Sequence, residues 1–576
     1  MATINFKGKS IIWNHHLSVP YHTLEVLPEL GHNSDHANGN LIVEGDNLIA
    51  LKSLLPRYAG QVKCIYIDPP YNTGNEGWAY NDKVNSPLMR EWLDKEVGAD
   101  DLSKHEKWLC MMTPRLKLLR ELLTKDGVIF ISIDDNEQHN LRILLNEIMG
   151  ESNWVGTIIW KNATDNNPTN IAIEHENIHC YARDKTNLPN EWKSKISDVK
   201  EILVNIGNRL VEKYDDDSQL QLAYAAWFRA NKQFLAPLDR YKYIDRGGVY
   251  TGNQSVHNPG KEGYRYDVVH PVTKKPCKQP LMGYRFPEET MTELIKQKKI
   301  LFGDDDTKIV ELKLYANEYS DKLQSVIEMD GRLGAYELRD IFPETTKTFD
   351  NPKPSYLIKQ LVSFVVSKDD YVLDSFAGSG TTAHAVLDLN KEDGGNRKFI
   401  LVQMPEDSPQ DKDKNICRDV TRERVKRVIE RNEKQPAQTK MDEKKPEKVG
   451  FEYKRVGVAI DPESMLSGSL PTYEQLAEYV YYLATGKNIE SKKKIDFASS
   501  FVGQDKSVAI FLIYAQDWEK LGKMALTLDI AEQMEQKYKD VEKIVYAPAC
   551  YLDEDYLDKF RIKFVSVPYN LFERVK

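Results

Sequence analysis

Residues 371–382 have the sequence YVLDSFAGSGTT, in which a short apolar run is followed by Asp374 and a glycine-rich turn. The run is typical of a buried strand, and apolar residues then recur at helical spacing from Ala383 to Asn390. Glycines let a backbone approach a ligand closely, and the N-terminus of a helix attracts a carboxylate or phosphate. The segment therefore predicts a strand, a candidate ligand-binding turn and a helix, which together form one unit of an α/β fold.

The turn alone does not identify its ligand. A Walker A loop would require Gly-Lys-Ser/Thr, whereas this chain has Gly380-Thr381-Thr382, so a nucleoside triphosphate is disfavoured. A dinucleotide is a weaker alternative, because the G-x-G-x-x-G pattern is incomplete. A plain tight turn between a strand and a helix is about as frequent as a cofactor site.

Alternating strands and helices on both sides of this segment predict a mainly parallel sheet. Further strands are expected at Leu41–Val43, Cys64–Ile67, Val128–Ile133, Trp154–Trp160, Ile178–Ala182 and Phe399–Val402. Helices are expected at Leu48–Leu55, Trp108–Leu123, Leu141–Ile148, Ser355–Val366 and Asn415–Asn432. Asp46 and Asp68 follow apolar runs, at the positions where such sheets contact their ligands.

The chain is expected to have several parts. Periodicity weakens between residues 185 and 343, where Gly, Pro, Tyr and Lys accumulate, so we expect an inserted domain of different architecture. The charged, apolar-poor residues 434–449 are typical of a linker. The predicted parts are an N-terminal extension (1–40), a first catalytic half (41–184), the insert (185–343), a second half with the turn (344–433), the linker (434–449) and a small α/β C-terminal domain (450–576). That last domain is expected to have strands at Val508–Ile513, Lys543–Tyr546 and Ile562–Val567, and helices at Tyr473–Leu483 and Trp518–Lys537.

A second informative stretch, Asp68-Pro69-Pro70-Tyr71, follows the predicted strand Cys64–Ile67. A purine amino group is a poor nucleophile because its lone pair is delocalised into the ring, and two acceptors for its N–H bonds would reorient that lone pair. The Asp68 carboxylate and the Pro69 carbonyl can be these acceptors, since two prolines stiffen the loop. Chemistry on a duplex base requires flipping it out of the stack, and the flat face of Tyr71 could recover roughly 1–3 kcal/mol by stacking on it.

Taken together, Asp68-Pro-Pro-Tyr71 and Phe376-Ala-Gly-Ser-Gly-Thr-Thr382 resemble the catalytic and cofactor motifs of amino-group DNA methyltransferases. Their order, with the catalytic motif first and a long insert before the cofactor motif, is similar to the beta class. Shorter phrases are most similar to the modification subunits of type III restriction-modification systems: Glu44-Gly45-Asp46-Asn47-Leu48, Ile133-Asp134-Asp135-Asn136-Glu137, His175-Glu176-Asn177 and Asn351-Pro352-Lys353-Pro354. This resemblance implies a Rossmann-like S-adenosylmethionine-dependent methyltransferase sheet that is circularly permuted and interrupted by a target-recognition domain.

The resemblance also implies roles for single residues. Asp68, Pro69, Pro70 and Tyr71 would hold the target base. The turn would bind S-adenosylmethionine, with Asp46 near its adenine and Lys353-Pro354 near its methionine end; the turn residues concerned are Asp374, Phe376, Ala377, Gly378, Ser379, Gly380, Thr381 and Thr382. Many such enzymes have an acid that binds the ribose after the next strand. Here Gln403 occupies that place and Glu406 comes later, so both are candidates.

The expected reaction is methylation of adenine N6. An aspartate at the head of the loop points to adenine, because related N4-cytosine enzymes usually have serine there, and cytosine N4 is the minor alternative. Transfer from a sulfonium is an in-line displacement that needs alignment and exclusion of water, and no metal or covalent nucleophile. RNA and protein-glutamine methyltransferases commonly begin the loop with asparagine, and a catalytically silent DNA-recognition module would be expected to have a damaged loop.

Partners follow from the same resemblance. They are double-stranded DNA, a second copy of the chain in a homodimer, and a helicase-nuclease restriction subunit, with a solitary methyltransferase as the alternative. The 576 residues carry a net charge of −9, which argues against a nonspecific polycation but allows basic residues to gather in one cleft. Six scattered cysteines lack metal-ligand spacing, and no apolar run approaches the roughly 18 residues of a membrane span, so we expect a cytoplasmic protein.

Overall fold

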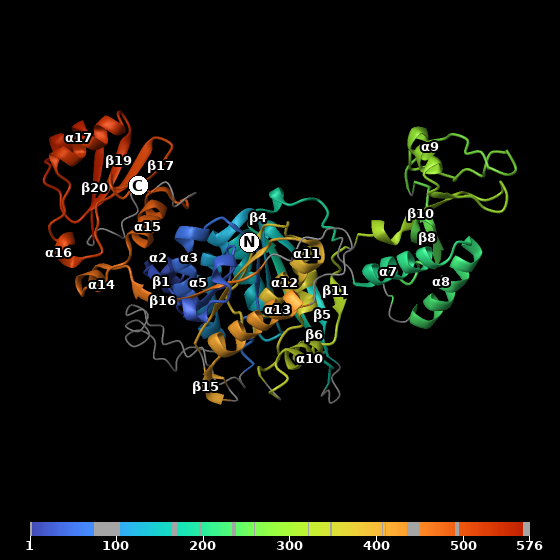
Figure 1. Cartoon of the computed structure of the whole chain (residues 1–576), viewed down its shortest axis with the longest axis horizontal. Helices are drawn as coiled ribbons and strands as arrows, with labels where there is room; N and C mark the ends of the chain where they lie inside the picture. The colour runs from blue at the N-terminus through green and yellow to red at the C-terminus, as the bar shows by residue number, and fades with distance from the viewer. Residues whose placement is uncertain are drawn as a thin grey trace. The chain divides into compact units, whose positions relative to one another are not determined.

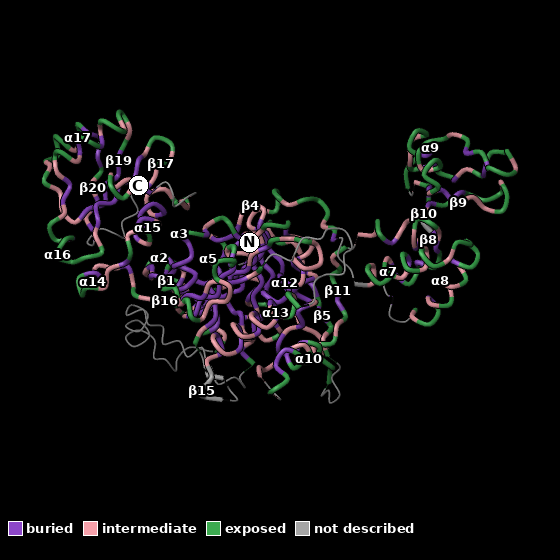
Figure 2. The backbone as a smooth tube through the Cα atoms, in the orientation of Figure 1, coloured by how far each residue is buried: buried purple, intermediate pink, exposed green. Residues whose placement is uncertain are grey.

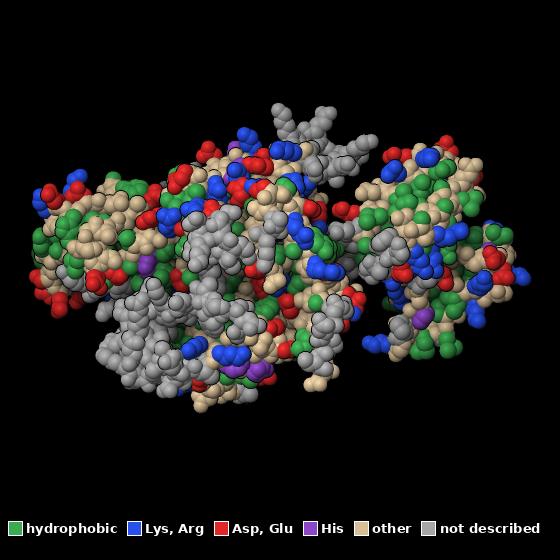
Figure 3. Space-filling model, turned by 90° about the horizontal axis from the view of Figure 1, so that it is seen from below, with side chains coloured by type: hydrophobic (Ala, Val, Ile, Leu, Met, Phe, Trp, Pro, Cys, Tyr) green, Lys and Arg blue, Asp and Glu red, His purple; other side chains and the backbone are tan. Residues whose placement is uncertain are grey.

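The computed structural model describes residues 3–73, 104–163, 170–194, 198–232, 235, 238–258, 260–320, 322–345, 348–405, 407–408, 411–434, 448–489 and 495–567. The chain divides into two compact units, which are described separately: Met1–Asn190 with Gln324–Lys576, and Glu191–Leu323. On the face drawn in Figure 3, Lys and Arg side chains are interspersed with Asp and Glu, so that face has no uniform charge.

A ten-stranded sheet forms the centre of the first unit. Its spatial order is β1 (His22–Val26), β16 (Glu452–Ala459), β2 (Leu41–Glu44), β13 (Lys398–Gln403), β12 (Tyr371–Asp374), β3 (Val62–Ile67), β4 (Leu123–Ile133), β6 (His175–Ala182), β5 (Trp154–Lys161) and β11 (Val326–Glu328). Consecutive strands from β16 to β4 pair in parallel, whereas β6 is antiparallel to both of its neighbours. The prediction of a mainly parallel α/β sheet is confirmed.

The helices that pack on this sheet form two groups, and neighbouring helices within each group contact one another (Figure 1). In one group, α5 (Lys104–Leu122) contacts both α3 (Asn47–Tyr58) and α6 (Gln138–Leu145). The other contains α11 (Ser355–Ser363), α12 (Thr381–Asp393) and α13 (Arg422–Lys434). Alternate residues of β3, Ile65 and Ile67, belong to one apolar core with Leu51 of α3 and Leu119 of α5. Figure 2 shows the buried residues concentrated along these central elements, as expected for strands covered on both faces.

The second unit differs in architecture from the first. Two helices, α7 (Asp198–Lys213) and α8 (Asp217–Asn231), precede an antiparallel sheet of order β7 (Tyr243–Asp245), β8 (Gly248–Ser255), β10 (Glu311–Tyr315), β9 (Ile300–Leu301), with α9 (Glu288–Lys296) between β8 and β9. The unit is shorter than the predicted insert at residues 185–343. The difference arises because β11 pairs with β5 of the central sheet and α10 (Arg332–Ile341) contacts α13.

The chain beyond the predicted linker also differs from expectation. Its first strand, β16, pairs with β2 inside the central sheet, and β1 of the predicted N-terminal extension pairs with β16. The rest forms a four-stranded sheet, β17 (Phe501–Asp505), β18 (Val508–Leu512), β19 (Glu542–Ala547) and β20 (Ile562–Ser566), as expected for the last three. The helix α15 (Tyr473–Thr485) contacts both this sheet and α3. In place of a continuous Trp518–Lys537 helix there are α16 (Trp518–Leu521) and α17 (Leu528–Lys537).

Across the described ranges, every helix is too short or too polar to cross a membrane.

The position of β16 in the central sheet predicts a stability effect at Tyr453. This fully buried tyrosine donates its hydroxyl hydrogen to the buried carboxylate of Glu44 on β2. Tyr453→Phe would leave that carboxylate short of a donor, so we expect the free energy of unfolding to fall by about 1–3 kcal/mol. Calorimetric unfolding checks this, with Tyr556→Phe as a control on a part-exposed helix. Equal behaviour of the two variants would contradict the buried position of Tyr453.

Candidate functional site

The two sequence motifs meet at one edge of the central sheet. Strands β12 and β3 are parallel neighbours, with Val372 opposite Cys64 and Leu373 opposite Ile65. The loops that leave their carboxyl ends therefore begin side by side, one at Asp374 and the other at Asp68, and this is the sheet edge at which α/β proteins bind ligands. This juxtaposition is the spatial arrangement on which the interpretation of both motifs depends.

Residues of α5 hold the loop that follows β3. The indole Nε1 of Trp108, a fully buried residue, donates to the Pro70 carbonyl at 2.7 Å. Asn72 has a positive φ of 61° and is buried, and its amide donates to Glu137 at 2.5 Å and to the carbonyl of Lys104 at 3.1 Å. Since both ends of the Asp68–Asn72 segment are fixed, its carboxylate and carbonyls need little reorganisation to act on a ligand.

Four charged or polar side chains converge at this loop. The Lys353 ammonium lies 2.9 Å from Asp68 Oδ2 and 3.1 Å from Glu176 Oε2, and it also donates to the Tyr71 hydroxyl at 2.9 Å. The Tyr71 hydroxyl lies within hydrogen-bond distance of both carboxylates, at 2.7 Å from Asp68 and 2.8 Å from Glu176. The second oxygen of Glu176 accepts from the amide of Asn162 at 2.7 Å. The cluster thus joins β3, β5, β6 and the segment before α11.

Protonation in this cluster follows from its charges. Burial alone would lower the pKa of Lys353, but the carboxylates of Asp68 and Glu176 raise it above its ordinary value. Burial and the same two carboxylates raise the pKa of Tyr71 well above its ordinary value. At neutral pH the lysine is therefore a cation and the tyrosine a neutral phenol.

The glycine-rich turn is fixed by its own hydrogen bonds and by two neighbouring segments. Asp374 is buried and accepts hydrogen bonds from the Phe376 N–H at 3.0 Å and the Thr382 hydroxyl at 2.6 Å. The amide of Asn47 donates to the Ser375 carbonyl at 3.1 Å, and the Gly378 N–H donates to the side-chain oxygen of Gln403 at 2.8 Å. Gly378 and Gly380 have φ values of 50° and 81°, which L side chains rarely adopt. The turn needs glycine at both positions.

A hollow of about 490 Å³ lies beside the charged cluster. Glu176 and Lys353 form one part of its wall, and Trp160 and Phe349 contribute aromatic rings. Phe349 also packs against the turn, since a Cβ placed on Gly378 would lie 3.1 Å from the edge of its ring. The wall of the hollow therefore includes residues that contact the Asp68–Tyr71 loop and one that contacts the glycine-rich turn.

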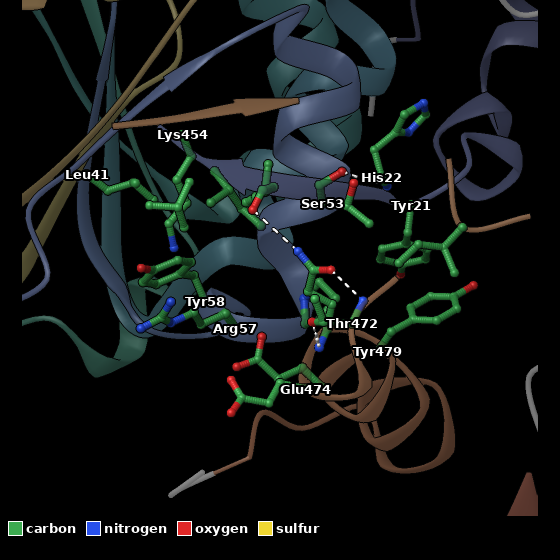
Figure 4. Close-up of a pocket in the computed structure, with 18 residues that line it drawn as sticks. Tyr21, His22, Leu41, Ser53, Arg57, Tyr58, Lys454, Thr472, Glu474 and Tyr479 are labelled. Carbon is green, nitrogen blue, oxygen red and sulfur yellow. Dashed lines mark hydrogen bonds between the residues drawn. The ribbon is translucent and has the colours of Figure 1, made fainter. Parts of the chain in front are cut away.

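Another hollow, of about 260 Å³, lies between β1, α3 and α15 (Figure 4). Its lining includes Tyr58, Lys454 and Glu474, and it contains none of the residues predicted for the site. None of its lining residues has a role in the reaction expected from the two motifs. The site is therefore assigned to the sheet edge at which the Asp68 and Asp374 loops begin.

The remaining predicted residues lie around this edge. Asp46 caps the N-terminus of α3 by accepting from Leu48 N–H and Ile49 N–H, and it lies 3.5 Å from the guanidinium of Arg115. Pro354 precedes the first residue of α11. The Lys353 ammonium contacts the catalytic loop, and its predicted contact with the methionine end of a cofactor stays a prediction. Glu406 lies outside the described residues, and Gln403 is engaged with the turn.

Two members of the site were not predicted as functional residues. Glu176 belongs to the phrase His175-Glu176-Asn177 that the sequence comparison singled out, but only the antiparallel pairing of β6 with β4 brings it to Asp68. Asn162 follows β5 and reaches Glu176 through the β5–β6 hairpin. The phrase was a usable signal for Glu176, whereas Asn162 had none.

A family model described as DNA methylase matches residues 62–407, which is more than half of the chain and contains both motifs. The chain belongs to the DNA methylase family. It is 50% identical over 425 residues to the type III restriction-modification enzyme EcoP15I Mod subunit of Escherichia coli, an alignment that covers 70% of this chain and 66% of that protein.

Two further relatives of this DNA methylase are also named as Mod subunits of type III restriction-modification enzymes. The StyLTI Mod subunit of Salmonella typhimurium is 32% identical over 70% of this chain and 59% of its own length. The EcoPI Mod subunit of Escherichia phage P1 is 32% identical over 65% of this chain and 59% of its own length. The alignments span slightly less than two thirds of these relatives, and they confirm the predicted resemblance to type III modification subunits.

Asp374 gives the methylase a pH-dependent stability. Burial raises the pKa of Asp374 from 3.8 to about 7, although Thr382 and Phe376 donate to it. Between these two pH values the unfolded chain releases the proton that the folded chain keeps, so stability falls as pH rises from about 4 to about 7. Across that interval, the free energy of unfolding of the wild-type chain should fall by roughly 2–4 kcal/mol more than that of Asp374→Asn.

Chemical denaturation at several pH values checks this slope. Asp393→Asn is the control. Burial would raise the pKa of Asp393, but the Arg397 guanidinium lowers it below its ordinary value, so this carboxyl is ionised throughout the interval. A parallel pH profile for wild type and Asp374→Asn would show that Asp374 carries its charge when folded.

Proposed function

We propose that this chain methylates the N6 amino group of adenine in double-stranded DNA, with S-adenosyl-L-methionine as the methyl donor. We further propose that it serves as the modification and specificity subunit of a type III restriction-modification system. Membership of the DNA methylase family and the names of the Mod relatives support this assignment. The observation that carries it is the parallel pairing of β12 with β3, which sets the Asp68–Tyr71 loop beside the glycine-rich turn.

In this proposal Asp68 and Pro69 accept the two hydrogens of the target amino group. Their oxygens are held by a loop in which the Pro70 carbonyl is already bonded to Trp108. Accepting both hydrogens localises the nitrogen lone pair and directs it out of the ring plane, which raises its nucleophilicity. The cofactor, when bound, would supply an electrophilic methyl group to this lone pair, and the proton that the nitrogen then gives up would pass along its hydrogen bond to the Asp68 carboxylate. Pre-set acceptors lower the barrier because they need not reorganise during the step.

Lys353 has two consequences for Asp68. Its ammonium forms an ion pair with the Asp68 carboxylate at 2.9 Å and holds that carboxylate in place. It also occupies one of the directions from which the target amino group would donate. Glu176 at 3.1 Å offers the ammonium an alternative partner when the base enters. Tyr71 would then stack on the base, with its hydroxyl still held by Glu176.

The cofactor would bind along the glycine-rich turn. The residues assigned to it are Asp46, Lys353, Pro354, Asp374, Phe376, Ala377, Gly378, Ser379, Gly380, Thr381, Thr382, and Gln403 or Glu406. S-adenosyl-L-methionine supplies an electrophilic methyl group on a sulfonium. A hollow of about 490 Å³ lies beside the charged cluster, with Glu176 and Lys353 in its wall. The circular permutation, the homodimer, the helicase-nuclease partner and the target-recognition role of the insert belong to the same proposal.

Mixed-sequence DNA incubated with the protein and the cofactor should yield N6-methyladenine on digestion, without N4-methylcytosine. Asp68→Ala removes one acceptor, and we expect a rate loss of roughly 10²–10³-fold with cofactor binding retained. Mass spectrometry of nucleosides and calorimetric titration with the cofactor measure the two effects. Asp126→Ala, which removes a surface aspartate paired with Lys63, is the matched control. N4-methylcytosine as the product would overturn the choice of target base.

Tyr71 should contribute through its ring more than through its hydroxyl. Tyr71→Ala loses base stacking, so the affinity for the extruded base should fall roughly 10–100-fold, whereas Tyr71→Phe keeps the ring and most of the affinity. Fluorescence of 2-aminopurine, placed at the adenine found to be methylated, measures the extruded population. Equal losses in both variants would assign the effect to the hydroxyl and its contacts with Asp68 and Glu176.

A further inference from the structure

A buried arginine lies directly against the glycine-rich turn. Arg424 of α13 has no exposed surface, and its Nη1 donates to the hydroxyls of Ser379 and Thr381, both at 2.8 Å. Its Nη2 lies 3.1 Å from Nδ1 of His384, one turn further along α12. The guanidinium therefore holds the end of the turn and the first turn of the helix that follows it.

The residues before Arg424 hold the same turn. The Thr421 hydroxyl donates to the Gly378 carbonyl at 2.6 Å. A Cβ on Gly380 would lie 3.1 Å from the Thr421 carbonyl oxygen, so the two backbones are in close contact. Gln403 holds Gly378 from β13, and the Thr421–Arg424 segment adds a second set of contacts from the start of α13.

The charge of Arg424 is poorly compensated. Its nearest carboxylate, that of Glu337, lies 3.6 Å away, and among the described residues its Nε has no hydrogen-bond partner. Burial lowers the pKa of Arg424 to about 10, so it remains a cation at neutral pH. Burying a cation costs stability unless close partners compensate it, so packing alone does not explain an arginine at this position. The contacts of Arg424 therefore point to a role in the turn.

Arg424 orients hydroxyl groups and connects two parts of the site. Because Ser379 and Thr381 accept from the guanidinium, their own O–H bonds point away from it, and the two oxygens lie 3.2 Å apart. On its other side, Glu337 accepts from the Ser355 N–H at 2.9 Å, directly after Lys353 and Pro354. A continuous path of polar contacts thus runs from the turn to the segment that carries Lys353.

We propose that Arg424 is a positioning residue for the cofactor. It sets the shape of the turn and the direction of the Ser379 and Thr381 hydroxyls, and through Glu337 it aligns the turn with the Lys353 segment. The inference rests on the proposed function, because the ligand concerned is S-adenosyl-L-methionine. It adds a residue of α13, outside both sequence motifs, to those on which cofactor affinity depends.

Calorimetric titration of the full chain with S-adenosyl-L-methionine tests the proposal. Arg424→Gln should raise Kd roughly 10–100-fold, the loss expected for hydrogen bonds to a charged group. Arg424→Lys keeps the charge but has no planar fork to reach both hydroxyls, so we expect an intermediate increase of roughly 3–10-fold. The matched control is Arg397→Gln, which removes an equally buried arginine whose ion pair with Asp393, at 2.7 Å, lies outside the turn.

Thermal unfolding of each variant separates positioning from stability. If Arg424 acts on the turn, Arg424→Gln weakens binding while Arg397→Gln, at a similar loss of stability, binds within about twofold of wild type. Folded Arg424→Gln with wild-type Kd would overturn the proposal, and so would wild-type Kd in Arg424→Lys if the glutamine variant does not fold. Failure of the wild-type chain to bind the cofactor would instead reject the proposed function, and this inference with it.

Discussion

The parallel pairing of β12 with β3 is the constraint on which the site depends. These strands come from distant parts of the chain, and their pairing sets the Asp68 loop and the Asp374 turn at the same sheet edge. In the proposed reaction neither motif could act alone. One would offer acceptors for an amino group, and the other would let the protein backbone approach the cofactor closely. Lys353 connects the neighbouring strands, since its ammonium contacts Asp68, directly after β3, and Glu176 on β6. A central strand pair buried on both faces is a rigid base for such alignment.

Two acids at neighbouring strand ends have different surroundings. Asp68 has a cation at 2.9 Å, whereas burial raises the pKa of Asp374 to about 7 and its partners are a backbone N–H and a hydroxyl. One sheet edge thus holds a carboxylate that is ion-paired with a cation beside a buried carboxyl whose pKa is raised. Polar contacts continue from the turn through Arg424 and Glu337 to the Lys353 segment, so the low dielectric strengthens a connected network.

Much of this organisation could be predicted from the sequence, because buried parallel strands have long apolar runs. The strands at Val128–Ile133 and Phe399–Val402 were predicted for this reason, and the glycines after Leu373 predicted the turn. The edge strand β1 was not, since His22–Val26 mixes polar and apolar residues. β16 was missed because its alternating charges resemble the linker before it. Asp68 and Tyr71 followed from local motif chemistry, whereas Glu176 and Arg424 depend on strand register and helix packing, which no short stretch of sequence encodes.

The place of the insert in the chain is consistent with a separation of recognition from chemistry. The chain leaves the first unit at Asn190, after β6, and returns at Gln324, just before β11 pairs with β5. Both points adjoin β6 and β11 near one end of the strand order, away from the central strands β2, β13, β12 and β3. Residues of Glu191–Leu323 can therefore change without altering the register of β12 and β3. If Glu191–Leu323 reads the target sequence, as proposed, the chain can acquire a new target sequence while Asp68, Lys353 and the glycine-rich turn keep their geometry.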